Sequence, residues 1–452
     1  MYKTTFKLFL IACLFLSTTI CFGQQCSEFQ VTLNSQADVD AFPVNNPDCT
    51  IVQDLLITGN SITNLNGLSQ ITEVTGTLTI DITAPEGENY NLTNIDGLNN
   101  ITTVGMFLNI SGIPNVVSND MFPNLTSLGI DLYLTGLLPE HVNGFHHLTT
   151  FENVVVTDTS SLSMNCFSAL TTLTGSITMA YNEFTTFTGF NLLSSIDEGN
   201  VGTIAIAHNA NLIALPNFEN LTHVEMLQIQ HCHSLQNFQG LESLQTVGYL
   251  YIDYNNILEN LTGLQNLTSS DNYITLLHNP LLNDISALSN IPATNVLEIR
   301  GNTSITTLSA FDNLNLTDAM FVFITDNLNL TTCATTGICN RLAQLGTASV
   351  EVYNNGSTCN TAQEIQTTCG IMNVDKNNKD LNIIAYPNPV INILNIDYTG
   401  KAAKYSISDV QGRITMSGKF DNQIDVSKLL VGIYFISLQL QNETSVIKFV
   451  KR

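Results

Sequence analysis

Short stretches in which apolar and polar residues alternate recur along most of the chain, and most of them end in asparagine. The clearest copies are LLITGN, IAIAHN and LEIRGN, which end at Asn60, Asn209 and Asn302. Because the two apolar residues of L-x-I lie on one face of a strand, a single copy cannot bury them alone. Stacked copies bury them together, so the pattern predicts a β-rich parallel solenoid. Thirteen copies occur, mostly 22 to 25 residues apart, and the weaker ones end at Thr83, Ile113, Leu137, Thr159 and Cys232.

A second element follows each strand, as in residues 62–74, 92–104 and 235–247. Its apolar positions recur every three residues, which favours tight turns or short 3₁₀ pieces over a long α-helix. The asparagine lies where the chain leaves the strand. Its amide can bond backbone groups that would otherwise be buried without a partner.

These repeats resemble the leucine-rich repeat, L-x-x-L-x-L-x-x-N/C-x-L, and more closely the receptor L-domain-like version found in bacterial surface proteins. The resemblance covers about residues 26 to 370 and implies the fold, not the ligand. In leucine-rich repeats a cysteine can take the asparagine position, as Cys232 does, and Cys166 falls where Gly144 stands one turn earlier. We therefore expect both cysteines to be small buried residues and not a bonded pair.

The segments that flank the solenoid at 51–332 contain cysteines and are typical of caps. A solenoid leaves an unpaired sheet edge at each end, and a cap covers it. The N-terminal cap, 24–50, holds Cys26 and Cys49, which we expect to be bonded in an oxidising compartment. A zinc site at the other end is disfavoured because it has no CxxC spacing and no nearby histidine. The C-terminal cap with the last turn, 333–370, holds four disulfide candidates whose pairing stays open: Cys333, Cys339, Cys359 and Cys369.

The first 23 residues are typical of a secretory signal peptide. Lys3 and Lys7 precede thirteen apolar residues, and Gly23 is the expected cleavage point. Thirteen residues fall short of the roughly 20 that span a bilayer, which disfavours an uncleaved anchor. Lipid attachment at Cys13 is a second alternative, and it would leave a very short apolar region. We expect no transmembrane segment in the mature chain.

The period stops near the C-terminus, where a polar linker at 371–381 precedes short alternating stretches at 382–452. These stretches predict a small antiparallel β-sandwich. Their motifs resemble the type A C-terminal sorting domain of the type IX secretion system, which implies that the tail is an address for that machinery. The residues that carry the resemblance are the Gly412–Arg413 turn and Tyr386, Pro387, Asn388, Pro389, Gly432, Tyr434 and Lys448.

The repeat region and the C-terminal tail differ in charge. Residues 26–370 hold 31 acidic residues against two basic ones, Arg300 and Arg341, whereas residues 371–452 hold seven acidic and ten basic residues. A field of this sign repels phosphate backbones, so we expect no nucleic-acid partner. We interpret the excess of acidic residues mainly as a source of solubility in a salty medium. We expect no cofactor. The acidic charge is compatible with calcium binding, which stays an alternative.

The sequence contains no recognisable catalytic motif, so we expect no enzyme. Hydrolysis of glycans by paired carboxylates is the remaining catalytic alternative. Five successive turns carry a flat side chain just before the asparagine position, from Tyr181 to His278. Within this column His208 and His231 are weak candidates for metal ligands. The alternative is a surface ladder of stacked rings.

The outward positions of the later strands combine aromatic and charged side chains, as a recognition surface requires. Ordinary strand propensity of aromatic residues is the simpler explanation. We expect a secreted or surface-attached recognition or adhesion protein that binds an extracellular protein or glycan, with a structural surface-layer or matrix protein as the alternative. The candidate ligand-binding residues are Tyr249, Tyr251, Asp253, Tyr273, Glu298, Arg300, Phe321, Phe323 and Tyr353.

Overall fold

A computed structural model describes residues 24–26, 28–82, 91–113, 115–116, 120–137, 141–161, 163–196, 202–370, 383–397, 402–440 and 444–452. The chain divides into two compact units, Met1–Met372 and Asn373–Arg452. The predicted signal peptide and the predicted linker lie outside the described residues. In the part of the chain that is described, no helix is both long and apolar enough to cross a membrane.

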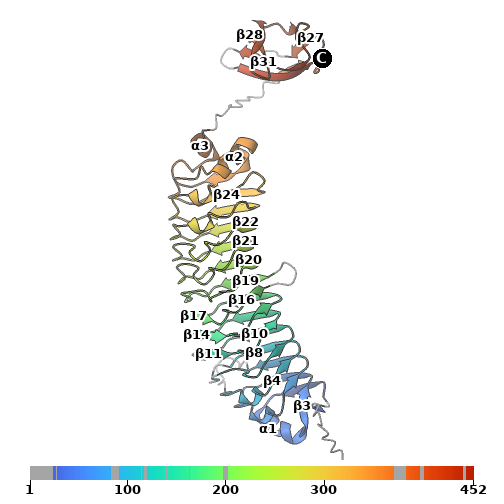
Figure 1. Cartoon of the computed structure of the whole chain (residues 1–452), viewed down its shortest axis with the longest axis vertical. Coiled ribbons are helices and arrows are strands. Elements are labelled where there is room, and N and C mark those ends of the chain that lie inside the picture. Colours follow the sequence, from blue (N-terminus) through green and yellow to red (C-terminus); the bar gives the residue numbers. More distant parts are fainter. Residues whose placement is uncertain are drawn as a thin grey trace, which may run out of the picture. The chain divides into compact units, whose positions relative to one another are not determined.

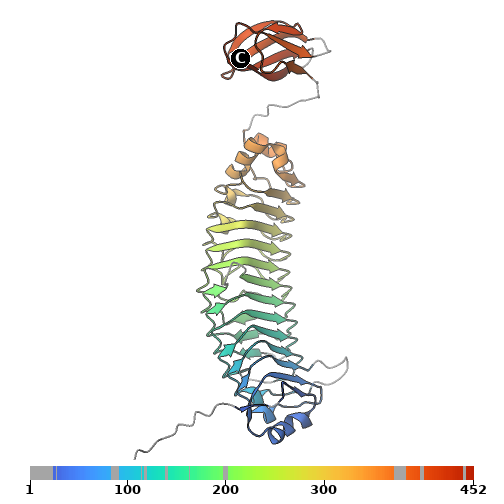
Figure 2. The ribbon, with the colours of Figure 1, turned by 90° about the vertical axis from the view of Figure 1, so that its right-hand side faces the viewer.

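One sheet of fourteen parallel strands runs along the first unit (Figures 1 and 2). Each of the thirteen predicted copies supplies one strand, with about twelve turns between the first copy and the last. The remaining strand, β2 (Gln30–Leu33), comes from the segment that we assigned to the N-terminal cap, because Val31 and Leu33 extend the same buried face. The other strands, in sheet order, are β4 (Asp54–Thr58), β6 (Leu78–Asp81), β8 (Leu108–Ser111), β10 (Asp131–Thr135), β13 (Asn153–Thr157), β16 (Ser176–Ala180), β19 (Thr203–Ala207), β20 (His223–Gln230), β21 (Thr246–Asp253), β22 (Ser269–Leu277), β23 (Val296–Arg300), β24 (Phe321–Thr325) and β25 (Glu351–Tyr353).

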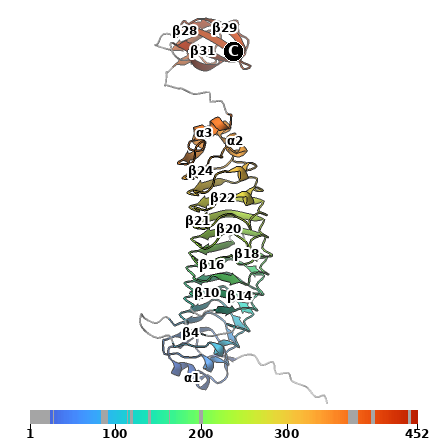
Figure 3. The ribbon, with the colours of Figure 1, turned by 90° about the vertical axis from the view of Figure 1, so that its left-hand side faces the viewer.

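Short strands form three further parallel sheets on other sides of the solenoid (Figure 3). The predicted 3₁₀ pieces occur as η1 (Asn66–Leu68), η2 (Asp96–Leu98), η3 (Ser286–Leu288) and η4 (Ser309–Phe311). The three small sheets consist of β1 (Gln24–Gln25), β3 (Cys49–Val52), β5 (Glu73–Val74), β7 (Thr103–Val104) and β9 (Ser127–Leu128); of β12 (Thr150–Phe151), β15 (Thr172–Leu173) and β18 (Ser195–Ile196); and of β11 (His141–Gly144), β14 (Ser163–Cys166) and β17 (Thr186–Thr188).

The apolar residues of the alternating pattern fill the space between these sheets. Leu250 and Ile252 of β21 are fully buried, and the strands beside them repeat the arrangement. In the N-terminal half a row of buried aromatic rings adds to this core, with neighbouring centroids 5.3 to 5.8 Å apart. The rings belong to Phe122, Phe145, Phe167, Phe190 and Phe218.

Helices and disulfides close both ends of the solenoid (Figure 1). At the N-terminal end, α1 (Gln36–Asn45) lies beside the predicted Cys26–Cys49 bond. At the C-terminal end, α2 (Thr336–Leu345), η5 (Thr347–Ser349) and α3 (Ala362–Thr368) pack against one another, and α3 contacts β25. Here Cys333 pairs with Cys359 and Cys339 with Cys369, which settles the connectivity that the sequence left open.

The second unit consists of two antiparallel sheets that share one buried core. Val390, Ile407, Ile436 and Phe449 are fully buried in it. One sheet has the order β26 (Ile384–Tyr386), β27 (Ile393–Asp397) and β30 (Gln423–Asp425); the other has the order β29 (Ile414–Lys419), β28 (Ala402–Asp409), β31 (Gly432–Leu440) and β32 (Thr444–Lys451).

Candidate functional site

The residue before the asparagine position adopts a left-handed backbone conformation in turn after turn. The φ angle is +58° at Tyr181, +55° at His208 and +53° at His231, and Gly301 has the same conformation at +68°. This conformation is uncommon outside glycine, so it marks a tightly constrained turn at the end of each strand. The residue that follows the left-handed residue is buried, and Asn209, for example, is fully buried.

The buried asparagines form a hydrogen-bonded ladder from turn to turn. The backbone N–H and the side-chain amide of Asn255 both donate to Oδ1 of Asn279, at 2.9 and 3.2 Å. Asn279 donates to Oδ1 of Asn302 in the same way, at 3.0 and 3.3 Å. Asn255 also donates to the carbonyl of Ile229 at 3.1 Å. The ladder therefore satisfies the backbone groups at the ends of the strands and holds those ends rigidly.

Cys232 occupies the asparagine position, as predicted, and its backbone N–H donates to Oδ1 of Asn255 at 2.9 Å. Both Cys166 and Cys232 are buried, and neither forms a disulfide bond. Burial raises the pKa of the Cys232 thiol to about 12, although hydrogen bonds from Asn209 oppose the shift. Burial also raises the pKa of Cys166 far above its ordinary value. Both thiols therefore stay protonated at neutral pH and make poor nucleophiles.

The side chains of the left-handed residues form a continuous stack of five rings. Neighbouring ring centroids lie 4.3 to 4.9 Å apart, and the ring planes differ by 6° to 21°. His208 and His231, the weak metal candidates, are nearly parallel at 4.3 Å. Parallel imidazoles direct their nitrogen lone pairs side by side and not toward a common point. Among the described residues, no group of three or more potential ligands is placed to hold a metal ion.

The register of the long sheet places the predicted recognition residues in adjacent columns. Tyr249 lies opposite Tyr273, and their rings stack with centroids 5.0 Å apart. Tyr251, Glu298 and Phe323 lie in a second column, separated only by Thr275 between the first two. The structure therefore brings these candidates together on one face.

Asp253 differs from the prediction because it is buried beneath its neighbours, with 7% of its surface exposed. The Tyr251 hydroxyl donates to Asp253 Oδ2 at 3.0 Å, and His278 Nδ1 lies 3.1 Å from Asp253 Oδ1. Partial burial and the Asp253 carboxylate raise the pKa of Tyr251 to about 12. Asp253 therefore orients the Tyr251 ring and links this face to the ring stack instead of contacting solvent.

The end of the face nearest α2 carries a mixed charged and aromatic group. Arg300 Nη2 lies 3.3 Å from Glu298 Oε1, and Arg300 Nε donates to the hydroxyl of Thr325 at 3.1 Å. The rings of Phe321 and Phe323 stack with centroids 5.6 Å apart. The exposed fractions are 49% for Phe321, 46% for Tyr353 and 40% for Tyr273. We call the residues Tyr249, Tyr251, Tyr273, Glu298, Arg300, Phe321, Phe323 and Tyr353 the aromatic face.

A groove of about 560 Å³ extends this face between β24 and η5. Its lining includes Phe321 and Phe323 together with Met320, Arg341 and Glu351. Sequence reasoning missed Met320 and Arg341, because both lie outside the repeating pattern. The single available signal was Arg341 itself, one of two basic residues in an otherwise acidic region.

In the second unit the predicted motif residues connect the beginning of the unit to its last strand. Asn388 Oδ1 accepts from the backbone N–H of Val450 at 2.9 Å, and Asn388 Nδ2 donates to the carbonyl of Lys448 at 3.3 Å. Tyr434 packs on Phe449 and donates to the carbonyl of Leu430 at 3.1 Å. The motif thus closes the fold of the unit.

The rest of that motif lies mainly on the surface. Tyr386, Pro387 and Pro389 are exposed. An added Cβ at Gly432 would meet only ordinary contacts with Tyr434, so packing does not explain this glycine.

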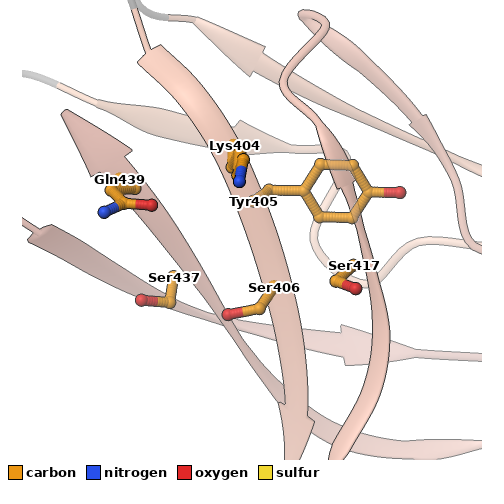
Figure 4. A pocket seen from close by; sticks show the side chains of 6 residues that line it. All are labelled: Lys404, Tyr405, Ser406, Ser417, Ser437 and Gln439. Carbon is orange, nitrogen blue, oxygen red and sulfur yellow. The ribbon is translucent and has the colours of Figure 1, made fainter.

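A shallow polar hollow of about 290 Å³ lies on the four-stranded sheet of the second unit (Figure 4). Tyr405 extends across it toward β29, where Gly418 leaves room for its ring. A Cβ at Gly418 would lie 3.0 Å from that ring. The other lining residues are Lys404, Ser406, Ser417, Ser437 and Gln439.

Comparison with known proteins identifies the second unit. No curated protein matches the chain. Residues 384–452, however, match the family model of the secretion system C-terminal sorting domain. The matched residues include both antiparallel sheets of the unit as well as Asn388 and β32, which Asn388 contacts. The last part of the chain is a type IX C-terminal sorting domain, and the protein is exported to the outer cell surface or the extracellular space.

Proposed function

We propose that the exported protein is a non-catalytic recognition or adhesion protein that binds an extracellular protein or glycan through the aromatic face. The observation that carries the proposal is the concentration of aromatic rings beside a charged pair on β21 to β25. Aromatic side chains and arginine dominate the binding energy of most protein interfaces. In contrast, the matching middle positions of the earlier strands are mostly small or aliphatic, as at Thr79, Val155 and Ala205, and Tyr133 is the one aromatic residue among them.

The rigidity of the aromatic face supports a binding role. Tyr251 is oriented by Asp253, Arg300 by Thr325 and Glu298, and the strands below them by the asparagine ladder. Side chains that are already ordered lose little conformational entropy when a partner binds. This arrangement favours recognition over a purely structural role for the surface.

We further propose that the solenoid is of the leucine-rich-repeat or receptor L-domain type. The asparagine ladder and its substitution by Cys232 support this assignment. A role without catalysis is supported by the engagement of the carboxylates in and beneath the aromatic face, since Glu298 lies beside Arg300 and the buried Asp253 accepts from Tyr251. Neither is placed as an unpaired acid or base.

The test is binding by point variants of the purified protein to partners selected on a protein and glycan array. Tyr251→Ala and Phe323→Ala should each weaken binding, because an aromatic anchor contributes about 2 kcal/mol, or roughly thirtyfold in affinity. Thr79→Ala, at the same position of an earlier strand, is the control and should bind normally. Equal and negligible effects of all three substitutions would place the binding surface elsewhere.

A further inference from the structure

The groove beside the aromatic face combines apolar walls with a basic floor. Met320 is 66% exposed and Phe321 is 49% exposed at its rim, and Ala348 and Val350 line the η5 side. Arg341 also lines the groove, although only 4% of its surface is exposed. An apolar cavity with one convergent charged group is the usual form of a small-ligand or peptide-end site.

Arg341 is a buried cation without a carboxylate partner. Its Nη1 donates to the carbonyls of Leu316 and Ala319 at 2.9 and 2.6 Å, and its Nε donates to the carbonyl of Ser349 at 2.8 Å. Among the described residues, Nη2 has no hydrogen-bond partner, and no acidic group forms an ion pair with this guanidinium. The three carbonyls hold the side chain in place, which leaves Nη2 available to a ligand.

The wall formed by β24 is an incompletely paired strand edge. On one side β24 pairs with β23 from Phe321 onward, whereas on the other side β25 begins to pair only at Phe323. Residues 347–350 diverge there, and 348–350 line the groove instead. An open stretch of strand edge can hydrogen-bond the main chain of an extended peptide.

We propose that this groove binds the C-terminal end of a peptide chain, with the terminal carboxylate on Arg341 and an aromatic or large aliphatic last side chain against Phe321 and Met320. This inference rests on the proposed function and names the class of partner. A single carboxylate suits the site because Glu351 at the rim and the acidic solenoid repel ligands with several negative charges. A polyacidic glycan is therefore disfavoured.

The chain contains no tryptophan, so a peptide that ends in tryptophan supplies a fluorescence signal free of background. The probe is acetyl-Ala-Ala-Trp with a free carboxylate, and its C-terminal amide is the matched control. The carboxylate peptide should bind about tenfold more tightly than the amide, since the charge-assisted hydrogen bond is absent from the amide complex. Fluorescence anisotropy titrations on the purified protein measure both affinities.

Three variants locate the site. Arg341→Gln should abolish the preference for the carboxylate, and circular dichroism checks that it folds. Phe321→Ala, at an exposed position that does not hold the fold, should weaken both peptides about tenfold. Thr79→Ala, at the middle position of an earlier strand far from the groove, should leave peptide binding unchanged.

Equal affinities for the carboxylate and the amide would overturn the assignment, as would displacement by oligogalacturonate at lower concentration than by the peptide. If the peptides fail to bind while Tyr251→Ala still removes binding to an array-selected partner, the peptide-end site is wrong and the proposed function stands. If the peptides bind as expected while Tyr251→Ala has no effect on any selected partner, the groove stands and the broader aromatic face is wrong.

Discussion

At the scale of single residues, the left-handed position explains why one column of the sequence differs from the rest. Alignment of the repeats was sufficient to predict a row of flat side chains, and the structure shows that their rings stack. Alignment could not predict that Asp253 is buried. It occupies an outward position, and Tyr251 and His278 approach it from neighbouring positions.

The ring stack makes a prediction about pH. Partial burial and the neighbouring His208 lower the pKa of His231, with a smaller contribution from His233, whereas Asp253 opposes the shift. The unfolded chain therefore takes up a proton on His231 at a higher pH than the folded protein, so protonation favours unfolding. The contribution of His231 to stability is fully present above about pH 6.5, the ordinary histidine pKa, and decreases as the pH falls to the lower pKa of the folded state.

We expect His231→Tyr to lose less stability between pH 7.5 and pH 5 than the unsubstituted protein. Tyrosine occupies the same position at Tyr181 and Tyr254, so the ring stack is retained. Urea denaturation midpoints at a series of pH values provide the measurement. Superimposable pH profiles for the two proteins would contradict the role of His231.

At the scale of elements, the long strands could be predicted because each alternates over at least three residues and ends at a recognisable turn. Two-residue strands such as β5 and β7 could not be predicted, since two residues are too few to show an alternation of apolar and polar positions. The groove was also beyond sequence reasoning. It depends on the divergence of residues 347–350 from the sheet, and Met320 and Arg341 belong to no repeat.

The asparagine ladder joins these elements, and Asn279 tests its strength. Asn279→Ala would remove the acceptor of the buried backbone N–H of Asn255 and one of the donors to the carbonyl of Ile252, which lies within the paired strand β21. A buried donor left without a partner costs about 1–3 kcal/mol, so we expect a loss of this size in the free energy of unfolding. The control is Asn283→Ala, because the Asn283 amide bonds the carbonyl of Leu281 at the exposed surface. Chemical denaturation of both variants gives the comparison, and equal losses would show that the ladder adds nothing specific.

At the scale of the whole molecule, the two units differ in charge as well as in fold. The solenoid region is strongly acidic, whereas basic residues outnumber acidic ones after residue 370. Each unit has its own buried core. The composition shift lies close to the boundary between the two units, and the sorting function could be predicted because its motif residues are local in sequence. The ligand could not be predicted, because ligand binding depends on how side chains from several distant turns come together.

Because the two units have separate cores, the C-terminal sorting domain can be removed without disturbing the solenoid. A chain that ends at Ala385 retains the described solenoid residues, both caps and all three disulfides. It lacks Asn388 and β32, whose contacts complete the sorting domain. We expect it to accumulate in the periplasm in folded form, whereas the full-length chain reaches the outer surface. Surface proteolysis and cell fractionation locate the two chains, and non-reducing peptide mapping of the retained chain checks the Cys26–Cys49 bond. Surface export of a truncated chain with its disulfides intact would mean that the address lies in the solenoid and not in the tail.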